Sequence, residues 1–187
     1  MKTIKTIALS LLIAFTTVAT AQTKQINTSK SKINWVGKKV TGKHEGTVDL
    51  KSGALVFKKN KLKGGTFVVD MTTISSTDLQ GDYKAKLDGH LKADDFFGTE
   101  KYPTAKLVFK KIGDKGNGVY AVTADLTIKD VTNSVSFLIT VKGNTATTSL
   151  KIDRTKYGIK YGSGSFFDNL GDKTINDEFE LEVSLAF

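Results

Sequence analysis

Apolar and polar residues alternate with a period of two along much of this 187-residue chain. From Tyr120 to Ile128 every second residue is apolar, and from Phe179 to Phe187 the apolar residues alternate with Glu180, Glu182 and Ser184. Phe67–Met71 and Val135–Val141 follow the same pattern. Because successive side chains of a β-strand point to opposite faces, each run predicts a strand with one buried face.

Less regular runs of the same kind complete the set of expected strands. They are Ile33–Val36, Thr47–Leu50, Ala54–Lys58, Ala105–Ile112 and Thr147–Asp153. Turn-forming residues punctuate the strands at Ser52-Gly53, Lys63-Gly64-Gly65, Gly113 to Gly118 and Gly143-Asn144. Strands with a single apolar face argue against a parallel sheet covered by helices on both sides. About eight or nine such strands predict an all-β fold, an antiparallel barrel, with a two-sheet sandwich as the alternative.

One stretch, from Asp78 to Phe97, breaks this alternation. Leu79, Tyr83, Leu87 and Leu91 recur at helical spacing within it. The pattern predicts a short helix and a long loop inserted between two strands, with Thr77 or Asp82 as the N-cap. Long insertions in a compact barrel are more often functional than neutral.

The N-terminus has the features of a secretion signal. Lys2 and Lys5 precede an apolar run from Ile7 to Val18, and Ala19-Thr20-Ala21 fits a signal peptidase site. The expected division is a signal peptide at 1–21 and one domain at 22–187, located in the periplasm or secreted. An uncleaved membrane anchor is the alternative, but the run is shorter than the ~20 residues that span a bilayer.

Composition narrows the choice of stabilising forces and partners. The chain contains no cysteine, which excludes disulfides and a thioether lipid anchor. Its formal charge is +9, with lysines clustered at Lys38-Lys39, Lys58–Lys63 and Lys110-Lys111. These lysines suit solvated strand ends or attraction to an anionic membrane. Nucleic acid is not an expected partner, because exposed aromatics are not interleaved with the lysines.

Candidate catalytic groups are sparse. His44 and His90 are the two histidines and lie in different segments. Gly162–Ser165 lacks the spacing of a nucleophile elbow, and the side chains of adjacent Asp94 and Asp95 diverge in an extended segment. We therefore expect no enzyme activity, no metal site and no cofactor. An eight-stranded barrel can instead be filled by its own side chains or hold one small ligand, and the residues leave both alternatives open.

Several motifs, taken in order, resemble one known family. They are Ile33–Gly37, His44–Val48, Val69–Ile74, Leu87–Phe97, Lys101–Ala105, Ala124–Thr132 and Ile152–Ile159. The combination of His-Leu-x-x-x-Asp-Phe-Phe, Lys-Tyr-Pro and Leu-Thr-Ile-x-x-Val-Thr is similar to that of the YceI family of bacterial exported proteins. The resemblance covers nearly all of residues 22–187.

The resemblance implies a lipocalin-like, eight-stranded barrel that holds a long isoprenoid chain, such as a polyprenyl or quinone tail. Members are typically periplasmic and non-enzymatic, and some form homodimers. Two departures affect the expected ligand: Val48 stands where many members carry a phenylalanine, and no arginine lies between Leu79 and Gly89. Lys84 or Lys86 is the candidate substitute for that arginine.

The pattern and the resemblance together give a candidate site. The expected apolar tunnel consists of Trp35, Phe57, Phe67, Val69, Phe109 and Phe137, with Phe96, Phe97 and Tyr102 as a gate. The expected polar mouth consists of Arg154 and Tyr157, with His90 and Lys92 as alternates. The expected function is that of a lipid carrier or reservoir. A ligand-free barrel that docks on a membrane or partner protein through its basic rim is the alternative.

Overall fold

Nine strands make up most of residues 20–187, the part of the chain that this computed structural model describes. The strands are β1 (Gln22–Gln25), β2 (Lys32–Lys39), β3 (Gly42–Lys58), β4 (Lys61–Ser76), β5 (Thr104–Gly116), β6 (Val119–Ile128), β7 (Val131–Lys142), β8 (Thr145–Asp153) and β9 (Ile175–Ala186). The helices are α1 (Gly81–Lys92) and the 3-10 helices η1 (Thr28–Lys30), η2 (Arg154–Tyr157) and η3 (Gly171–Lys173). Residues 1–19 of the predicted signal peptide lie outside the described part.

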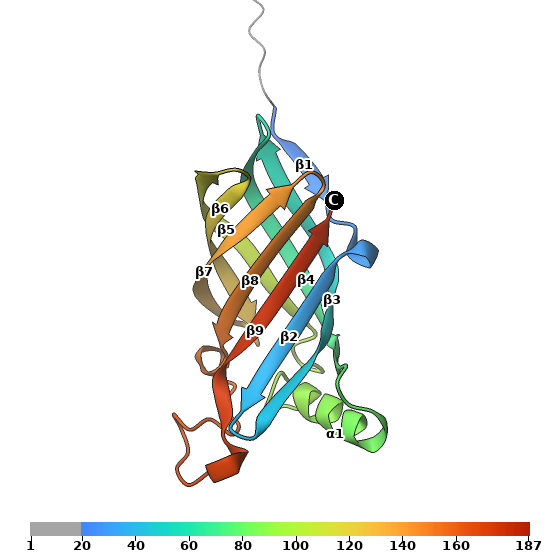
Figure 1. The fold of residues 1–187 in the computed structure, drawn as a ribbon, viewed down its shortest axis with the longest axis vertical. Coiled ribbons are helices and arrows are strands. Elements are labelled where there is room, and N and C mark those ends of the chain that lie inside the picture. Colours follow the sequence, from blue (N-terminus) through green and yellow to red (C-terminus); the bar gives the residue numbers. More distant parts are fainter. Residues whose placement is uncertain (1–19) are drawn as a thin grey trace, which may run out of the picture.

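Strands β2 to β9 close into an antiparallel barrel (Figure 1). Each strand pairs with the next along the chain, and β9 returns to β2, where Trp35 lies opposite Leu181. Strand β1 adds to β3 beyond the end of β2, with Gln22 opposite Phe57. Closure buries the apolar face of every strand, so the predicted barrel is confirmed and the sandwich is not observed.

Two of the predicted turns, Ser52-Gly53 and Lys63-Gly64-Gly65, lie inside strands β3 and β4. Ser52-Gly53 is part of the 17-residue strand β3, where a bulge between Leu50 and Ser52 shifts the register. Before the bulge the buried side chains of β3 have even residue numbers, and after it they have odd numbers. Leu50 and Leu55 therefore both face inward. The true turn is Lys59-Asn60, with φ of 51° and 61°. The sequence did not predict a turn at Lys59-Asn60, because lysine is an unusual residue at a left-handed turn position.

The glycines at these false turns make room for aromatic rings. A Cβ atom on Gly53 would lie 2.7 Å from the ring of Phe67, and one on Gly65 would lie 2.7 Å from the ring of Phe109. Both glycines therefore lie in strands because a ring covers them from inside the barrel. The two rings contact each other, with centroids 5.5 Å apart.

The predicted helical insertion is present between β4 and β5. Helix α1 begins at Gly81 after Gln80, and neither Thr77 nor Asp82 caps it as predicted, because the helix starts between them. Of the predicted apolar face, Leu91 is buried, whereas Tyr83 is 78% exposed. No helix within residues 20–187 has the length and hydrophobicity needed to cross a bilayer.

The two ends of the barrel are closed in different ways. The "helix end" carries α1, the β2–β3 turn and residues 158–174, and the "C-terminal end" carries β1 and Phe187 (Figure 1). At the C-terminal end Leu55 is fully buried, Leu62 is almost so, and the rings of Phe57 and Phe187 lie 5.7 Å apart. At the helix end, the chain after α1 folds Phe96 and Phe97 into the barrel.

Candidate functional site

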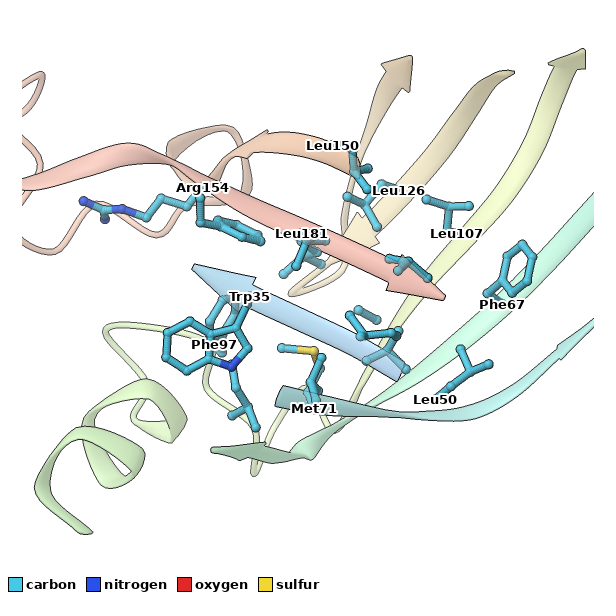
Figure 2. A pocket seen from close by; sticks show the side chains of 18 of the residues that line it. Trp35, Leu50, Phe67, Met71, Phe97, Leu107, Leu126, Leu150, Arg154 and Leu181 are labelled. Atoms are coloured by element: carbon cyan, nitrogen blue, oxygen red, sulfur yellow. The ribbon is translucent and has the colours of Figure 1, made fainter. Parts of the chain in front are cut away.

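An apolar cavity of about 180 Å³ lies inside the barrel between these two closed ends. Figure 2 shows its wall, with Arg154 at one end and Phe67 at the other. The wall comprises Ile33, Trp35, Gly37, Val48, Leu50, Phe67, Val69, Met71, Ile74, Leu91, Phe96, Phe97, Ala105, Leu107, Phe109, Leu126, Ile128, Phe137, Ile139, Thr148, Leu150, Arg154, Ile175, Asn176, Phe179, Leu181, Val183 and Leu185. Thr148, Arg154 and Asn176 are its polar members, so hydrophobic contact dominates what the cavity can bind.

The alternation of the strands places these side chains. Every barrel strand contributes alternate residues to the wall, such as Phe67, Val69 and Met71 of β4. The matching outward positions, such as Thr66, face solvent. One face of each strand therefore forms the cavity, and no special motif is required to build it.

Aromatic rings close the cavity at the helix end. Phe96 and Phe97 pack edge to face with centroids 5.2 Å apart, and Phe97 reaches Phe179 of β9 at 6.3 Å. Trp35 lies against Gly46, where a Cβ atom would come within 2.5 Å of the indole ring. The indole nitrogen Nε1 of Trp35 donates to the carbonyl of Thr47 at 3.2 Å, which fixes the ring in the wall.

Arg154 is the charged residue of the wall, and its side chain is only 2% exposed. Its guanidinium donates from Nε to the carbonyl of Asn176 at 3.0 Å, from Nη1 to Ile159 at 2.9 Å, and from Nη2 to Ile175 at 3.0 Å. Burial lowers the pKa of Arg154, and the nearby carboxylate of Asp177 opposes that effect. The guanidinium therefore ties η2 to β9 and the loop, and most of its donors are occupied.

The other residues predicted for the mouth lie outside the cavity wall. Tyr157 is buried, its hydroxyl has no hydrogen-bond partner among the described residues, and burial raises its pKa to about 12. The ring of His90 lies between Phe96 and Tyr161, at centroid distances of 5.3 and 4.4 Å. Lys92 ends α1. Contact of any of these residues with a ligand remains a prediction.

Most of the predicted tunnel residues come together in the wall. These are Trp35, Phe67, Val69, Phe96, Phe97, Phe109 and Phe137. Phe57 does not line the cavity, because it packs beyond it against Phe187 at the C-terminal end. Tyr102 is also outside the wall, with the ammonium of Lys129 5.9 Å from its ring centroid.

The prediction favoured aromatic residues and overlooked smaller members of the wall. The alternation of apolar and polar residues predicts Leu126 and Leu181 on the buried faces of their strands, and both line the cavity. Asn176 had no such signal, because it enters the wall where β9 begins, beside the carbonyls that Arg154 binds. Polar wall residues at the ends of strands, such as Asn176, can therefore be identified only from the three-dimensional structure.

The two histidines, His44 and His90, contact different residues in different parts of the fold. Nδ1 of His44 lies 2.8 Å from Oδ2 of Asp78, whereas His90 packs among aromatic rings at the helix end. Within residues 20–187 no three histidine, aspartate or glutamate residues gather closely enough to hold a metal ion.

Solved structures with the same fold support the description of the barrel. BcnA from Burkholderia cenocepacia is 24% identical, with a TM-score of 0.65, over 87% of this chain and 99% of that protein. A polyisoprenoid binding domain from Saccharophagus degradans, implicated in plant cell wall breakdown, is 15% identical with a TM-score of 0.61, over 86% of this chain and 95% of that domain. At these identities the likeness concerns the fold.

The matches to curated sequence relatives cover shorter stretches of the chain. A UPF0312 protein of Shewanella denitrificans is 38% identical over 93 residues, which are 50% of this chain and 44% of that protein. A UPF0312 protein of Vibrio campbellii is 38% identical over 69 residues, or 37% of this chain and 33% of that protein. The chain thus spans less than half the length of these relatives. The YceI-like domain family matches residues 25–187, and the chain belongs to that family.

Proposed function

We propose that the barrel binds the apolar chain of an isoprenoid-type lipid and serves as its carrier or reservoir. The observation that carries this proposal is the almost wholly apolar cavity inside the barrel between Arg154 and Phe67. The polyisoprenoid binding domain with the same fold supports the choice of lipid class. No catalytic step is included, because the wall offers only Thr148, Asn176 and an arginine whose guanidinium mostly binds backbone carbonyls.

The energetics favour such a ligand. Each Å² of apolar surface removed from water contributes about 25 cal/mol, so burying a few isoprene units contributes several kcal/mol without polar recognition. A polar ligand would lose its hydration and find few partners in this wall. An apolar, flexible chain is therefore the chemical class that fits best.

The cavity volume sets a limit on chain length. About 180 Å³ is close to the size of an engineered apolar cavity of roughly 150 Å³ that takes up benzene. A short isoprenoid chain therefore needs modest adjustment of the wall, and a long polyprenyl or quinone tail needs larger movement. Phe109 and Phe137 are the residues we expect to move, because their rings meet edge to face, 5.9 Å apart, at the C-terminal end of the cavity.

Export is part of the proposal. The predicted signal peptide at 1–21 supports a location in the periplasm or outside the cell, where a lipid in transit between membranes needs shielding from water.

Gly37 provides a test of the cavity that leaves the fold intact. It lines the cavity, and a Cβ atom at this position would meet no atom within 4 Å. We expect Gly37→Leu to fold normally and to weaken binding of farnesol at least tenfold, because its side chain occupies part of the cavity. Thr66→Leu, which changes an outward position of β4, is the control. Farnesol binding can be measured by competition with a fluorescent lipid.

Equal affinity of both variants and the unchanged protein would contradict binding inside the barrel. Absence of farnesol binding, together with absence of binding to longer polyprenols, would contradict the proposed function as a whole.

A basic surface at the C-terminal end supports a second candidate, attraction to an anionic membrane. The β3–β4 and β5–β6 hairpin tips adjoin, since Nζ of Lys61 lies 2.8 Å from Oδ2 of Asp114. Exposed lysines on these and the neighbouring hairpin are Lys58, Lys59, Lys61, Lys63, Lys110, Lys111, Lys115 and Lys142. Each cation near the headgroups contributes about 1 kcal/mol. Salt-sensitive cosedimentation with anionic but not zwitterionic vesicles is expected, and equal binding to both would contradict it.

A further inference from the structure

The hydrogen-bonded ladder between β7 and β8 is incomplete. These strands pair only from Lys142–Thr145 to Ile139–Thr148, next to their turn. Beyond that point β7 still pairs with β6 and β8 still pairs with β9, so both strands continue in the sheet without contacting each other through a ladder. Figure 1 shows the two strands separating toward the helix end.

We call the gap between residues 134–138 of β7 and 149–152 of β8 the lateral opening. At its upper limit Oγ1 of Thr148 donates to the carbonyl of Leu138 at 2.7 Å. At its lower limit Nδ2 of Asn133 donates to the carbonyl of Lys156 at 3.0 Å. Between these two side-chain bonds, no hydrogen bond of the described residues joins β7 to β8.

The direction of the backbone groups along the opening follows from the neighbouring ladders. In an antiparallel strand, the N–H and C=O of successive residues point to opposite neighbours. The amide of Val141 donates to Gly118 beside β6, so the even residues of β7 face β8. The carbonyl of Asn144 accepts from Phe187 beside β9, so the odd residues of β8 face β7. The backbone groups of Ser136 and Ser149 therefore face the opening without a strand partner.

The opening has an apolar side and a polar side. On the inside, Phe137 and Leu150 line the cavity. On the outside, the side chains of Ser134, Ser136 and Ser149 are exposed. The unpaired stretch of β7 and β8 therefore has cavity-lining side chains on its inner face and exposed serines on its outer face.

We propose that the lateral opening binds the polar head of the lipid, with the apolar chain lying in the cavity. The inference rests on the proposed function. The head is an uncharged group that both donates and accepts hydrogen bonds, such as a hydroxyl, because unpaired N–H and C=O groups of the strands offer both roles. Arg154, predicted from sequence to bind the head, has most of its donors engaged.

The charges beside the opening also favour an uncharged head. Nζ of Lys151 lies 3.6 Å from a carboxylate oxygen of Glu180, and Nζ of Lys156 lies 3.9 Å from one of Asp153. Glu180 is shared with Lys38, whose Nζ lies 2.8 Å from the same oxygen, so carboxylates lie among the lysines beside the opening. A diphosphate in the opening would meet these carboxylates as well as the lysines, whereas a hydroxyl has no such repulsion.

Amide hydrogen exchange of the full-length folded protein, followed residue by residue by NMR, tests the proposal. In the free protein, the amides of Ser136 and Ser149 should exchange at least tenfold faster than those of Phe137 and Leu150, since the latter bond to β6 and β9. Farnesol should slow the exchange at Ser136 and Ser149. The matching hydrocarbon farnesane should not slow it, and farnesyl diphosphate should bind no more tightly than farnesol.

The outcomes separate this inference from the proposed function. Methyl signals of Leu126 and Leu181 report whether a chain enters the cavity. If farnesol shifts them but leaves Ser136 and Ser149 exchanging fast, the head lies elsewhere and the inference is wrong. Tighter binding of farnesyl diphosphate would also overturn it. If neither these three probes nor longer polyprenols shift the methyl signals, the proposed function itself is wrong.

Discussion

At the scale of single residues, the buried and half-buried ionisable groups of this protein serve mainly to join its segments. Arg154 binds three backbone carbonyls across η2, the following loop and β9. Asp88 of α1 accepts from the amide of Ser76 at 2.7 Å and from the hydroxyl of Ser75 at 2.7 Å. Both residues belong to motifs that resemble the family, and both have a structural explanation here.

Replacement of Arg154 should therefore destabilise the fold. Arg154→Ala leaves three carbonyls without their donors and is expected to cost about 3–5 kcal/mol in the free energy of unfolding. Arg154→Lys should recover little of it, because an ammonium cannot reproduce the planar fork. Urea unfolding measures both values. The exposed Lys156→Ala is the control, with a change within about 0.5 kcal/mol, and an Arg154→Ala loss that small would refute the structural role.

Asp88 makes the stability depend on pH in the acid range. Partial burial would raise its pKa, but bonds from Ser76, Ser75 and Lys84 outweigh that and lower it to about 2 from 3.8. A lowered pKa stabilises the folded state above the unfolded pKa, and this contribution disappears as the pH falls from about 4 to about 2. The side chain is 16% exposed, so the contribution is about 2 kcal/mol at most.

Asp88→Asn should lose this contribution at pH 7. Its unfolding free energy should fall by about 1–2 kcal/mol there, and its difference from the unchanged protein should shrink at pH 2. Urea titrations at the two pH values give the comparison. A difference that is the same at both pH values would show that the charge of Asp88 is not involved.

At the scale of elements, the strands were predictable and their limits were not. The alternation identified the runs around Phe67, Leu126 and Leu181 because each has one buried face. The alternation predicted two strands where the structure has β3 alone. The bulge near Ser52-Gly53 shifts which residues are buried and so resembles a break between strands. The short β7–β8 ladder left no sequence signal at all, since β7 and β8 keep their alternation on the sides that remain paired.

The glycines inside β3 and β4 can be tested as spaces for rings. Gly65→Ala places a Cβ atom 2.7 Å from the ring of Phe109 and is expected to cost about 1–3 kcal/mol, because the ring must move. The movement is directed into the cavity, so lipid affinity should fall as well. Gly113→Ala, where the nearest atom is 3.9 Å away, should change stability by less than about 0.5 kcal/mol. Thermal unfolding separates the two variants, and equal effects would refute the role of Gly65.

At the scale of the whole molecule, the barrel combines an apolar interior with closed ends and a stretch of its wall where β7 and β8 are not paired. The interior could be anticipated from the sequence, because one apolar face on each of eight strands has to be buried. The carbonyl contacts of Arg154 could not be anticipated, because they depend on how η2, the following loop and β9 meet at the helix end. The proposed head site lies where β7 and β8 do not pair, and neither composition nor periodicity shows where two neighbouring strands stop pairing.

The most direct test of the central claim is native mass spectrometry of the protein purified from its own cell envelope, followed by identification of the released lipid. We expect one apolar ligand of isoprenoid type per barrel, released when the protein is unfolded. A barrel that is empty on purification and that also fails to take up added farnesol or longer polyprenols would contradict the account.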